Sequence, residues 1–544
     1  MNNWPRCEKE RRKATPITKR FIGILLATSF LSACAVGPNY RKPVVQVPTS
    51  YRGATPGPEV QAQAASYADL PWWQVFQDSV LQELIRTALK QNYDLQLATE
   101  RINAARAQLT VTRSDQFPQV NASGVATDGK FFSGGFPAKT RYGTYAADAV
   151  FQLDLFGQLR RATEAARAQL LSTEYAQKTE ILTLVSDVAT DYFALLALDL
   201  QLQITRDTVK TQQDAVKLTK LRLEHGVPTK LDVLQAQQVL DTANAQIPDL
   251  ERQIGQLEDA LSILLGDYPH GVSRGHPLVE QPIPPEVPAG LSSSLLARRP
   301  DIFEAEQNLI AANAEIGVAK AAFFPQISLT GSGGGAAGRT TVFSTLINSN
   351  VGTWSYGAQL TQPIFEAEQN LIAANAEIGV AKAAFFPQIS LTGSGGGAAG
   401  RTTVFSTLIN SNVGTWSYGA QLTQPIFEAG RLRGNLRVAQ SQERQQLIAY
   451  KQAIQGAFRD VSDALIGYEK YHKVRVEQEI TVKDLQDTVD TSLMRYRGGI
   501  ATYLEVLDGQ RSLFSAELTL AQARGNEYQS LVQLYKALGG GWQH

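Results

Sequence analysis

The sequence predicts an all-α plus membrane-β fold, in which very long helices are joined to a few amphipathic strands. Three features of the 544-residue chain predict it. They are two proline-free stretches far longer than a globular domain needs, strands whose side chains alternate between apolar and polar, and a signal-type N-terminus that ends at a cysteine. Together they indicate a membrane-attached protein with long helices that extend well beyond the size of a globular domain.

The N-terminus has the pattern of a secretory signal. A basic stretch ending in "TPITKR" precedes the apolar run "FIGILLATSFL", which is too short to span a membrane as a helix. The next residues, "LSAC", resemble a bacterial lipobox, so Cys34 is the expected lipidation site and residues 1–33 the signal peptide. Ala35, in place of Asp, favours the outer membrane by the same resemblance. Cys7 lies in the signal peptide, so the mature chain has no disulfide or cysteine metal site.

Each half of the chain contains a long helical arm. Residues 158–225 lack glycine and proline, and a helix of that length extends for about 100 Å at 1.5 Å per residue. Apolar residues follow a seven-residue spacing, typical of supercoiled helices, at Leu195, Leu202, Val209, Val216 and Leu223. The second arm, Arg431–Arg497, has a corresponding seam at Val482, Leu485, Val489, Leu493 and Tyr496. Residues 229–266 and 502–538 are expected to fold back along these arms.

Between the arms the period of the pattern changes to two. In "TYAADAVFQLDLF" (144–156) and "WSYGAQLTQP" (354–363), apolar and polar residues alternate. Such strands suit a membrane barrel with a wet lumen. A soluble sandwich with one buried face would show the same alternation, but glycine-rich loops and aromatic strand ends beside a lipid anchor favour the membrane. Two hairpins give four strands, which cannot close a barrel, whereas three chains would give 12 strands.

A perfect duplication interrupts the second half. Residues 302–363 and 364–425 are identical, which indicates tandem duplication of one segment rather than a repeat architecture. A fainter repeat relates the two halves: "FPQVNASG" (117–124) resembles "FPQISLTG" (386–393). The chain is therefore a diverged two-fold pseudo-repeat that carries an extra segment.

The duplication copies both a hairpin and the helix before it. Use of both hairpins would give six strands per chain and 18 in a trimer, too wide for the same helical tube. A helix of about 20 residues would also carry the chain about 30 Å away from the membrane rim. We therefore expect one hairpin to join the barrel and the other copy to be looped out or disordered.

Several motifs resemble a known family, and the resemblance runs nearly end to end. They include "CAVGPNYRKP" (34–43), "LPWWQVFQDSVLQELIRTALKQNYDL" (70–95), "LLARRPDI" (295–302) and "RYRGGIATYLEVLDGQRSL" (495–513). These motifs resemble the outer membrane factors of tripartite efflux systems, the TolC/OprM family, in its lipoprotein (NodT-type) branch. The resemblance implies a TolC-like homotrimer: a 12-stranded outer-membrane β-barrel, four strands per chain, continued by a long periplasmic α-helical barrel.

The resemblance also implies a function and partners. The protein would be the outer membrane channel of an RND-type efflux system in a Gram-negative bacterium, exporting small molecules. Its partners would be a periplasmic adaptor (membrane fusion) protein, an RND inner-membrane pump and outer membrane lipid. The expected parts are the signal peptide (1–33), a lipidated extended segment (34–70), the first efflux repeat (71–266), a linker (267–294) and the second repeat (295–544).

The family's periplasmic gate lies where the inner helix pair turns. The matching positions are Leu504, Glu505 and Asp508, which in three chains would form rings of leucines and carboxylates around a narrow axis. An ordinary solvated turn with acidic residues has the same composition. Tyr496 and Asp232 match a Tyr–Asp pair that tethers the tip closed in the family.

Other function classes find little support in the sequence. Lys+Arg and Asp+Glu are equal at 51 each, so no nucleic-acid partner is indicated. The five histidines have no metal-ligand spacing, and no nucleophile elbow, P-loop or dinucleotide fingerprint occurs, so no enzyme and no cofactor beyond the lipid on Cys34 is expected. The glycine-rich "GSGGGAAG" (331–338) is expected to form an extracellular hairpin loop. The remaining alternative is a periplasmic adaptor lipoprotein of an efflux complex, which also has long helical hairpins.

Overall fold

The computed structural model of the chain describes residues 35–48, 71–133, 136–224, 230–281, 296, 298–324, 326–342, 345–361, 389–404, 407–422 and 431–540. The chain divides into two compact units. The strand unit comprises Met1–Lys42, Ala105–Leu170 and Asn308–Gln446. The helical unit comprises Pro43–Ala104, Leu171–Gln307 and Leu447–His544.

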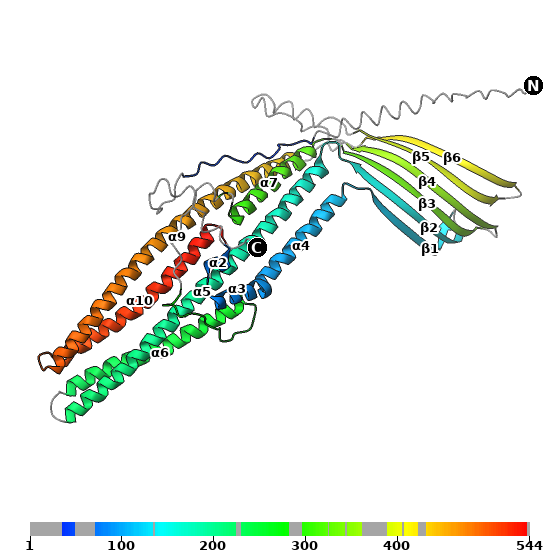
Figure 1. Ribbon diagram of the computed structural model, residues 1–544. Helices are drawn as coiled ribbons and strands as arrows, with labels where there is room; N and C mark the ends of the chain where they lie inside the picture. The colour runs from blue at the N-terminus through cyan, green and yellow to red at the C-terminus, as the bar shows by residue number, and fades with distance from the viewer. Residues whose placement is uncertain are drawn as a thin grey trace, which may run out of the picture. The chain divides into compact units, whose positions relative to one another are not determined.

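The helices confirm the predicted long arms and the helices that fold back along them (Figure 1). The two arms are α5 (Gln158–Glu224) and α9 (Arg431–Arg497), and their return helices are α6 (Lys230–Leu264) and α10 (Tyr503–Ala537). The shorter helices are α2 (Trp72–Val75), α3 (Ser79–Gln91), α4 (Tyr93–Ser114) and α7 (Pro300–Ala321).

The seven-residue seam of α5 forms the core of the helical unit. Leu195, Leu202, Val209 and Val216 are all buried, whereas Leu223, at the end of the arm, is 36% exposed. By length and composition α5 is apolar enough to cross a membrane, but 67% of its most apolar window is buried inside the protein. Its apolar character is therefore explained by packing against neighbouring helices.

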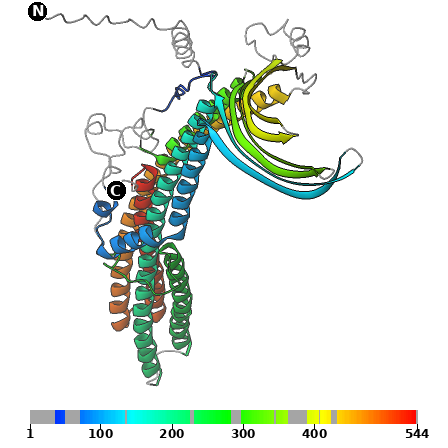
Figure 2. The ribbon, with the colours of Figure 1, turned by 90° about the vertical axis from the view of Figure 1, so that its right-hand side faces the viewer.

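The strands form a single antiparallel sheet in chain order, β1-β2-β3-β4-β5-β6. Figure 2 shows these six strands as one curved sheet. Their bounds are β1 Gln119–Ser133, β2 Phe136–Leu153, β3 Gln326–Val342, β4 Thr345–Thr361, β5 Ile389–Val404 and β6 Thr407–Leu422.

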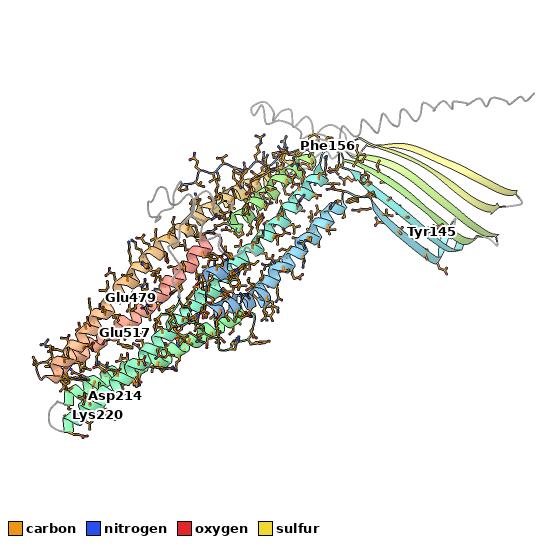
Figure 3. The ribbon with its side chains drawn as sticks, viewed as in Figure 1. Tyr145, Phe156, Asp214, Lys220, Glu479 and Glu517 are labelled. Carbon is orange, nitrogen blue, oxygen red and sulfur yellow. The ribbon has the colours of Figure 1, made fainter. Side chains whose placement is uncertain are left out.

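The pairing register aligns the apolar face from strand to strand. Phe151 lies opposite Leu329 in the β2–β3 pair, and Leu329 lies opposite Ala358 in the β3–β4 pair. Because successive side chains alternate between faces, this register keeps one apolar and one polar face. On the apolar face Val120 is 71% and Tyr145 64% exposed, and Figure 3 labels Tyr145 on the sheet. The predicted amphipathic strands are thus confirmed.

The prediction of four strands per chain is wrong for this protein. Both copies of the duplicated hairpin pair in the same sheet, as β3–β4 and β5–β6. The looped-out copy that we expected does not occur, and the count of 12 strands in a trimer, which depended on it, does not follow. The physical reason is that β5 has the sequence of β3, so it can pair with β4 as β3 does.

The glycine-rich stretch 331–338 also differs from the prediction. It belongs to β3 and is not a hairpin loop. In the β3–β4 register Gly331 lies opposite Tyr356 and Gly333 opposite Trp354.

Candidate functional site

The segment that follows Cys34 is tied to the junction between strand and helix. Cys34 itself lies outside the described residues, but the backbone N–H of Val36 donates to the carbonyl oxygen of Phe156 at 2.9 Å. Phe156 lies between β2 and α5, and its ring stacks on that of Phe324, just before β3, at a centroid distance of 4.7 Å. Figure 3 labels Phe156 at this junction. Residue 36 is therefore held at the edge where the strands meet the helices.

A close backbone approach and a buried arginine fix the same segment. Gly37 has φ +112°, and a Cβ placed on it would lie 2.5 Å from the Cα of Gly317 on α7, so any side chain there would clash. The guanidinium of Arg161 donates to the Asn39 side chain at 2.6 Å and pairs with Glu164 at 2.7 Å. These contacts explain structurally why Gly37 and Asn39 stand in the "GPNY" segment (37–40).

A tight turn joins α9 to α10 at the tip of the second arm. Gly499 has φ +73°, in the left-handed region that favours glycine. The N–H of Ile500 donates to the carbonyl of Arg495 at 3.0 Å, which closes the end of α9. Tyr503 then begins α10, so the predicted gate residues occupy its first two turns.

The three predicted gate residues lie on one exposed side of α10. Leu504 is 54% exposed, and the side chains of Glu505 and Asp508 are 46% and 67% exposed. Their i, i+1 and i+4 spacing places them together on the helix surface, while the intervening Val506 and Leu507 are buried.

Each gate carboxylate has an arginine partner that the sequence reasoning missed. Glu505 pairs with Arg495 across the turn at 3.7 Å, and Asp508 pairs with Arg511 one turn along α10 at 3.1 Å. The three-residue spacing of Asp508 and Arg511 was a readable signal, because such pairs face each other on a helix. The tip therefore carries alternating charges rather than carboxylates alone.

The two predicted tether residues converge on a third residue, Tyr503. The ring of Tyr496 lies 5.1 Å from that of Tyr503. Burial raises the pKa of the Tyr503 hydroxyl; the neighbouring Thr219 side chain opposes that rise, while the nearby Tyr496 and Asp232 add to it. Tyr503 is buried in an apolar cluster formed by α5, α6 and α10, so it is the point where the two helix pairs meet.

A buried carboxylate, Asp78, fastens the linker between the two repeats. It is 1% exposed and accepts hydrogen bonds from the Tyr192 hydroxyl at 2.9 Å and the Gln281 amide at 2.7 Å. It also accepts from the backbone N–H groups of His276 at 3.1 Å and Val80 at 2.8 Å. Burial alone would raise the pKa of Asp78, but these donors outweigh burial and hold it below its ordinary value. We call Asp78 and its donors Tyr192, His276 and Gln281 the latch. No local pattern in the sequence predicts it, because its members are far apart along the chain.

A second buried carboxylate, Glu527, joins α9 to α10. Glu527 is 3% exposed and binds Arg475 and the Nδ1 atom of His472, the latter at 2.7 Å. Glu479, labelled in Figure 3, forms ion pairs with Arg475 and with Arg524, each at 2.9 Å. Hydrogen bonds from these arginines overcome burial and lower the pKa of Glu479. We call these five residues the mid-arm charge cluster.

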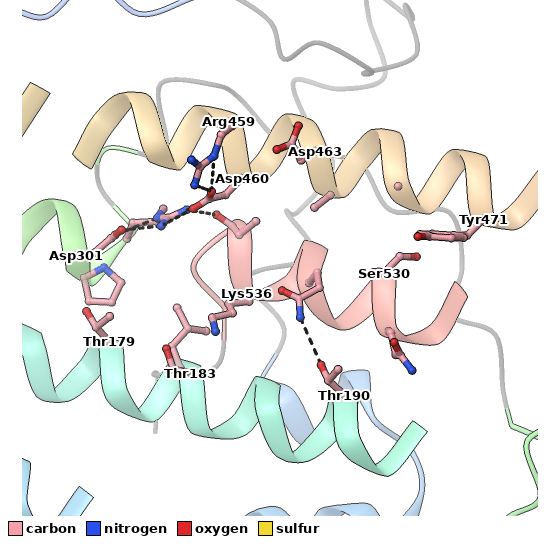
Figure 4. Close-up of a pocket in the computed structure, with 18 of the residues that line it drawn as sticks. Thr179, Thr183, Thr190, Asp301, Arg459, Asp460, Asp463, Tyr471, Ser530 and Lys536 are labelled. Carbon is pink, nitrogen blue, oxygen red and sulfur yellow. Dashed lines mark hydrogen bonds and ion pairs between the residues drawn. The ribbon is translucent and has the colours of Figure 1, made fainter. Parts of the chain in front are cut away.

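The "RRPDI" motif builds a polar recess of about 800 Å³ in the helical unit (Figure 4). Arg299 pairs with Asp301 at 2.6 Å and with Asp460 on α9 at 3.2 Å. It also donates to the carbonyl of Ala537 at the end of α10. Arg299 therefore clamps three helices together. Among the described residues, no group of three or more His, Cys, Asp or Glu side chains is arranged to hold a metal ion.

Comparison with known proteins agrees with this architecture. The outer membrane efflux protein family matches residues 84–267, 291–371 and 364–540, which cover most of the chain. Among relatives, the chain is 32% identical over 519 residues to the cation efflux system protein CusC of Escherichia coli O157:H7, covering 94% of this chain and 97% of that protein. It is 33% identical over 533 residues to the probable efflux pump outer membrane protein TtgC of Pseudomonas putida, covering 97% and 96%.

A third relative bears on the N-terminus, and solved structures bear on the fold. The chain is 31% identical over 523 residues to the probable outer membrane lipoprotein SilC of Salmonella typhimurium, covering 95% and 98%. A crystal structure of CusC superposes with a TM-score of 0.71 at 31% identity, covering 93% of this chain and all of that one. The open state of the Neisseria gonorrhoeae MtrE channel gives 0.70 at 28%, covering 94% and 99%.

These matches confirm the predicted TolC-like fold of long helices and membrane strands. They also confirm that the chain is a transport protein and not an enzyme. The chain belongs to the outer membrane efflux protein family, as an outer membrane channel of an efflux pump with a periplasmic helical extension.

Proposed function

We propose that the chain works as a homotrimer in a tripartite efflux system, together with a periplasmic adaptor protein and an RND-type inner-membrane pump. The observation that carries this proposal is the open sheet, in which β1 and β6 each pair with only one described strand. Unpaired backbone groups in lipid cost several kcal/mol each. The sheet also has an exposed apolar face, which includes Val120 and Tyr145 and which supports contact with lipid around a closed barrel.

The exported substrate is a small molecule whose class the relatives leave open. One relative is named for cation efflux, another for toluene efflux and a third for antibiotic efflux, at 32–33% identity in each case. A deletion strain, with and without the gene restored, should be tested against a panel of metal salts, toluene and a panel of antibiotics. We expect the restored gene to raise tolerance in one class. Equal susceptibility of both strains in every class, with the protein present in the outer membrane, would contradict an export role.

The homotrimer can be tested directly on the purified protein. In detergent, native mass spectrometry is expected to give three chains per particle, and the reconstituted protein to form pores in planar lipid. A stable monomer without pore activity would exclude the proposed assembly.

The lipid anchor is proposed at Cys34. Support comes from the contacts that hold Val36 and Gly37 at the strand–helix junction, which would place acyl chains on residue 34 close to the rim of the membrane. We expect Cys34→Ser to abolish incorporation of radiolabelled palmitate and to leave the signal peptide uncleaved. Cys7→Ser is the matched control, because Cys7 lies within the predicted signal peptide, and it should incorporate palmitate normally. If the Cys34→Ser variant still incorporates palmitate, another residue carries the lipid anchor.

We propose that Leu504, Glu505 and Asp508 line the periplasmic constriction. Three copies of this exposed patch around an axis would form rings of carboxylates, each with its arginine partner, and the leucines would narrow the passage. Tyr496 and Asp232, through Tyr503, would hold the two helix pairs together in the closed state.

The variant Asp508→Ala tests this constriction. Removing the carboxylate should raise single-channel conductance or weaken cation preference in planar lipid, because one ring of negative charge is lost. Asp249→Ala is the control: Asp249 is an exposed carboxylate on α6 that also pairs with an arginine three residues later. If the Asp508 and Asp249 variants both conduct like the unmodified channel, Asp508 is not at the gate.

A further inference from the structure

The second edge of β4 is occupied from within the same chain. In a sheet ending at β4, this edge would be free to pair with a neighbouring molecule. Instead, β5 pairs with it antiparallel, from Ser349 opposite Thr402 to Gln359 opposite Thr392. The duplicated hairpin, β5–β6, therefore occupies the edge of β4 that does not face β3.

The pairing of β5 with β4 preserves the faces of the sheet. Tyr356 lies opposite Gly331 on β3 and opposite Gly395 on β5. Gly395 is the copy of Gly333, so β4 pairs with β3 and with its copy in registers that differ by two residues. A shift of two residues leaves every residue on its original face, whereas a shift of one would exchange the apolar and polar faces. β5, the copy of β3, therefore joins the sheet with its apolar and polar faces on the same sides as those of β3 and β4.

The new outer edge is a copy of the old one. Residues 407–422 of β6 repeat the sequence of 345–360 in β4 letter for letter. In β4 this sequence pairs with an antiparallel neighbour, β5. In β6 the same sequence stands at the end of the sheet, where the next strand would pair. The remaining open edge of the described sheet is β1.

We propose that both hairpins form the barrel wall and that β6 of one chain pairs with β1 of the next copy of this chain. This inference rests on the proposed homotrimer. Three chains with six strands each form an 18-stranded barrel in place of a 12-stranded one. Because barrel diameter grows roughly linearly with strand number, the outer-membrane end is about 1.5 times wider. In the part of the chain that the structure describes there are two long helical arms, α5 and α9, so the added strands widen the β end.

A disulfide between β4 and β5 tests the wall position of the second hairpin. Ser355 and Gly396 lie directly opposite each other, and opposite Cα atoms in such pairs are about 4.5–5.5 Å apart, within the range of a disulfide. Ser355→Cys with Gly396→Cys should form an intrachain disulfide in outer membranes under mild oxidation. Ser355→Cys with Gly395→Cys is the control, because residue 395 faces the other side of the sheet, and it should stay reduced. No disulfide in the first variant, or one that links two chains, would overturn the proposal.

Electron cryomicroscopy of the full chain in lipid nanodiscs counts the strands directly. We expect 18 strands for the full chain and 12 for a variant that lacks residues 364–425. A trimer with 12 strands in the full chain would overturn the six-stranded wall while leaving the homotrimer intact. A particle that is not trimeric would instead contradict the proposed assembly, and its strand count per chain would still decide the present inference.

Discussion

Replacing Arg475 by alanine is expected to lower the thermal stability of the protein more than any other single change to the mid-arm charge cluster. The substitution leaves the carboxylate of Glu527 buried and facing only the His472 ring. Breaking a buried ion pair from one side costs about 3–5 kcal/mol. Melting of the full-length protein in detergent, followed by circular dichroism at 222 nm, should show a midpoint lower by on the order of 5 °C.

Two further variants show how far the loss of stability in Arg475→Ala comes from the buried, unpaired carboxylate rather than from the loss of an ion pair as such. Arg475→Met combined with Glu527→Leu removes both charges, and we expect a midpoint near that of the unmodified protein, because apolar residues of similar volume often replace a buried pair without loss. Arg252→Ala removes a pair whose arginine side chain is 55% exposed, and it should cost less than about 1 kcal/mol. If Arg475→Ala melts like Arg252→Ala, the cluster does not stabilise the arm.

Asp78→Ala is expected to have a comparable effect through a different mechanism. The change leaves the Tyr192 hydroxyl, the Gln281 amide and the His276 N–H without their shared acceptor. Hydrogen bonds to a charged group contribute about 1.5–3 kcal/mol each, and water entering the vacated space restores part of this, so we expect a loss of about 3–5 kcal/mol. The melting midpoint of the full-length protein is again the measurement, with Asp249→Ala as the exposed control.

The same carboxylate predicts a dependence of stability on pH. The pKa of Asp78 is lower in the folded protein than its ordinary value, so the folded state binds fewer protons at this site than the unfolded state. Its contribution to stability is therefore complete above about pH 4 and is lost as pH falls through the folded pKa. The difference in midpoint between the Asp78→Ala variant and the unmodified protein should shrink below pH 4. A constant difference down to pH 2 would show that the charge of Asp78 is not what stabilises the latch.

Local patterns in the sequence were sufficient to predict the arms and the strands. The seven-residue spacing from Leu195 to Val216 predicts a buried helix stripe, and these residues are buried. The two-residue alternation in 144–156 predicts an amphipathic strand, and the β2–β3 register aligns its apolar face with that of β3. Such signals are contained in a short window, because helix and strand periods repeat within a few residues.

Contacts between distant segments could not be predicted in this way. Tyr503 looked like any aromatic residue at a turn, and only the meeting of α5, α6 and α10 makes it the partner of Tyr496 and of Asp232. Asp78 likewise depends on Gln281, two hundred residues away along the chain. The number of strands differs from the prediction for a related reason: the sheet extends by pairing with the nearest compatible edge, whereas the prediction rests on the width of an assembled tube.

The alternative of an adaptor lipoprotein does not hold. The family match covers both halves of the chain, and the similarity to solved outer membrane channels extends over more than nine-tenths of it. Two helical arms separated by membrane strands, rather than one hairpin flanked by soluble domains, is the organisation that the structure has.

Because the duplicated segment contains a whole hairpin, it adds two strands to the sheet and keeps neighbouring strands antiparallel. The last strand, β6, runs in the same direction as β4, so in the proposed trimer the β1 strand of a neighbouring chain meets an antiparallel edge, as it would without the insertion. A single added strand would have reversed that direction and forced a parallel junction, for which a circular antiparallel wall has no place. Whole hairpins are thus the natural increment by which such a wall can be enlarged during evolution.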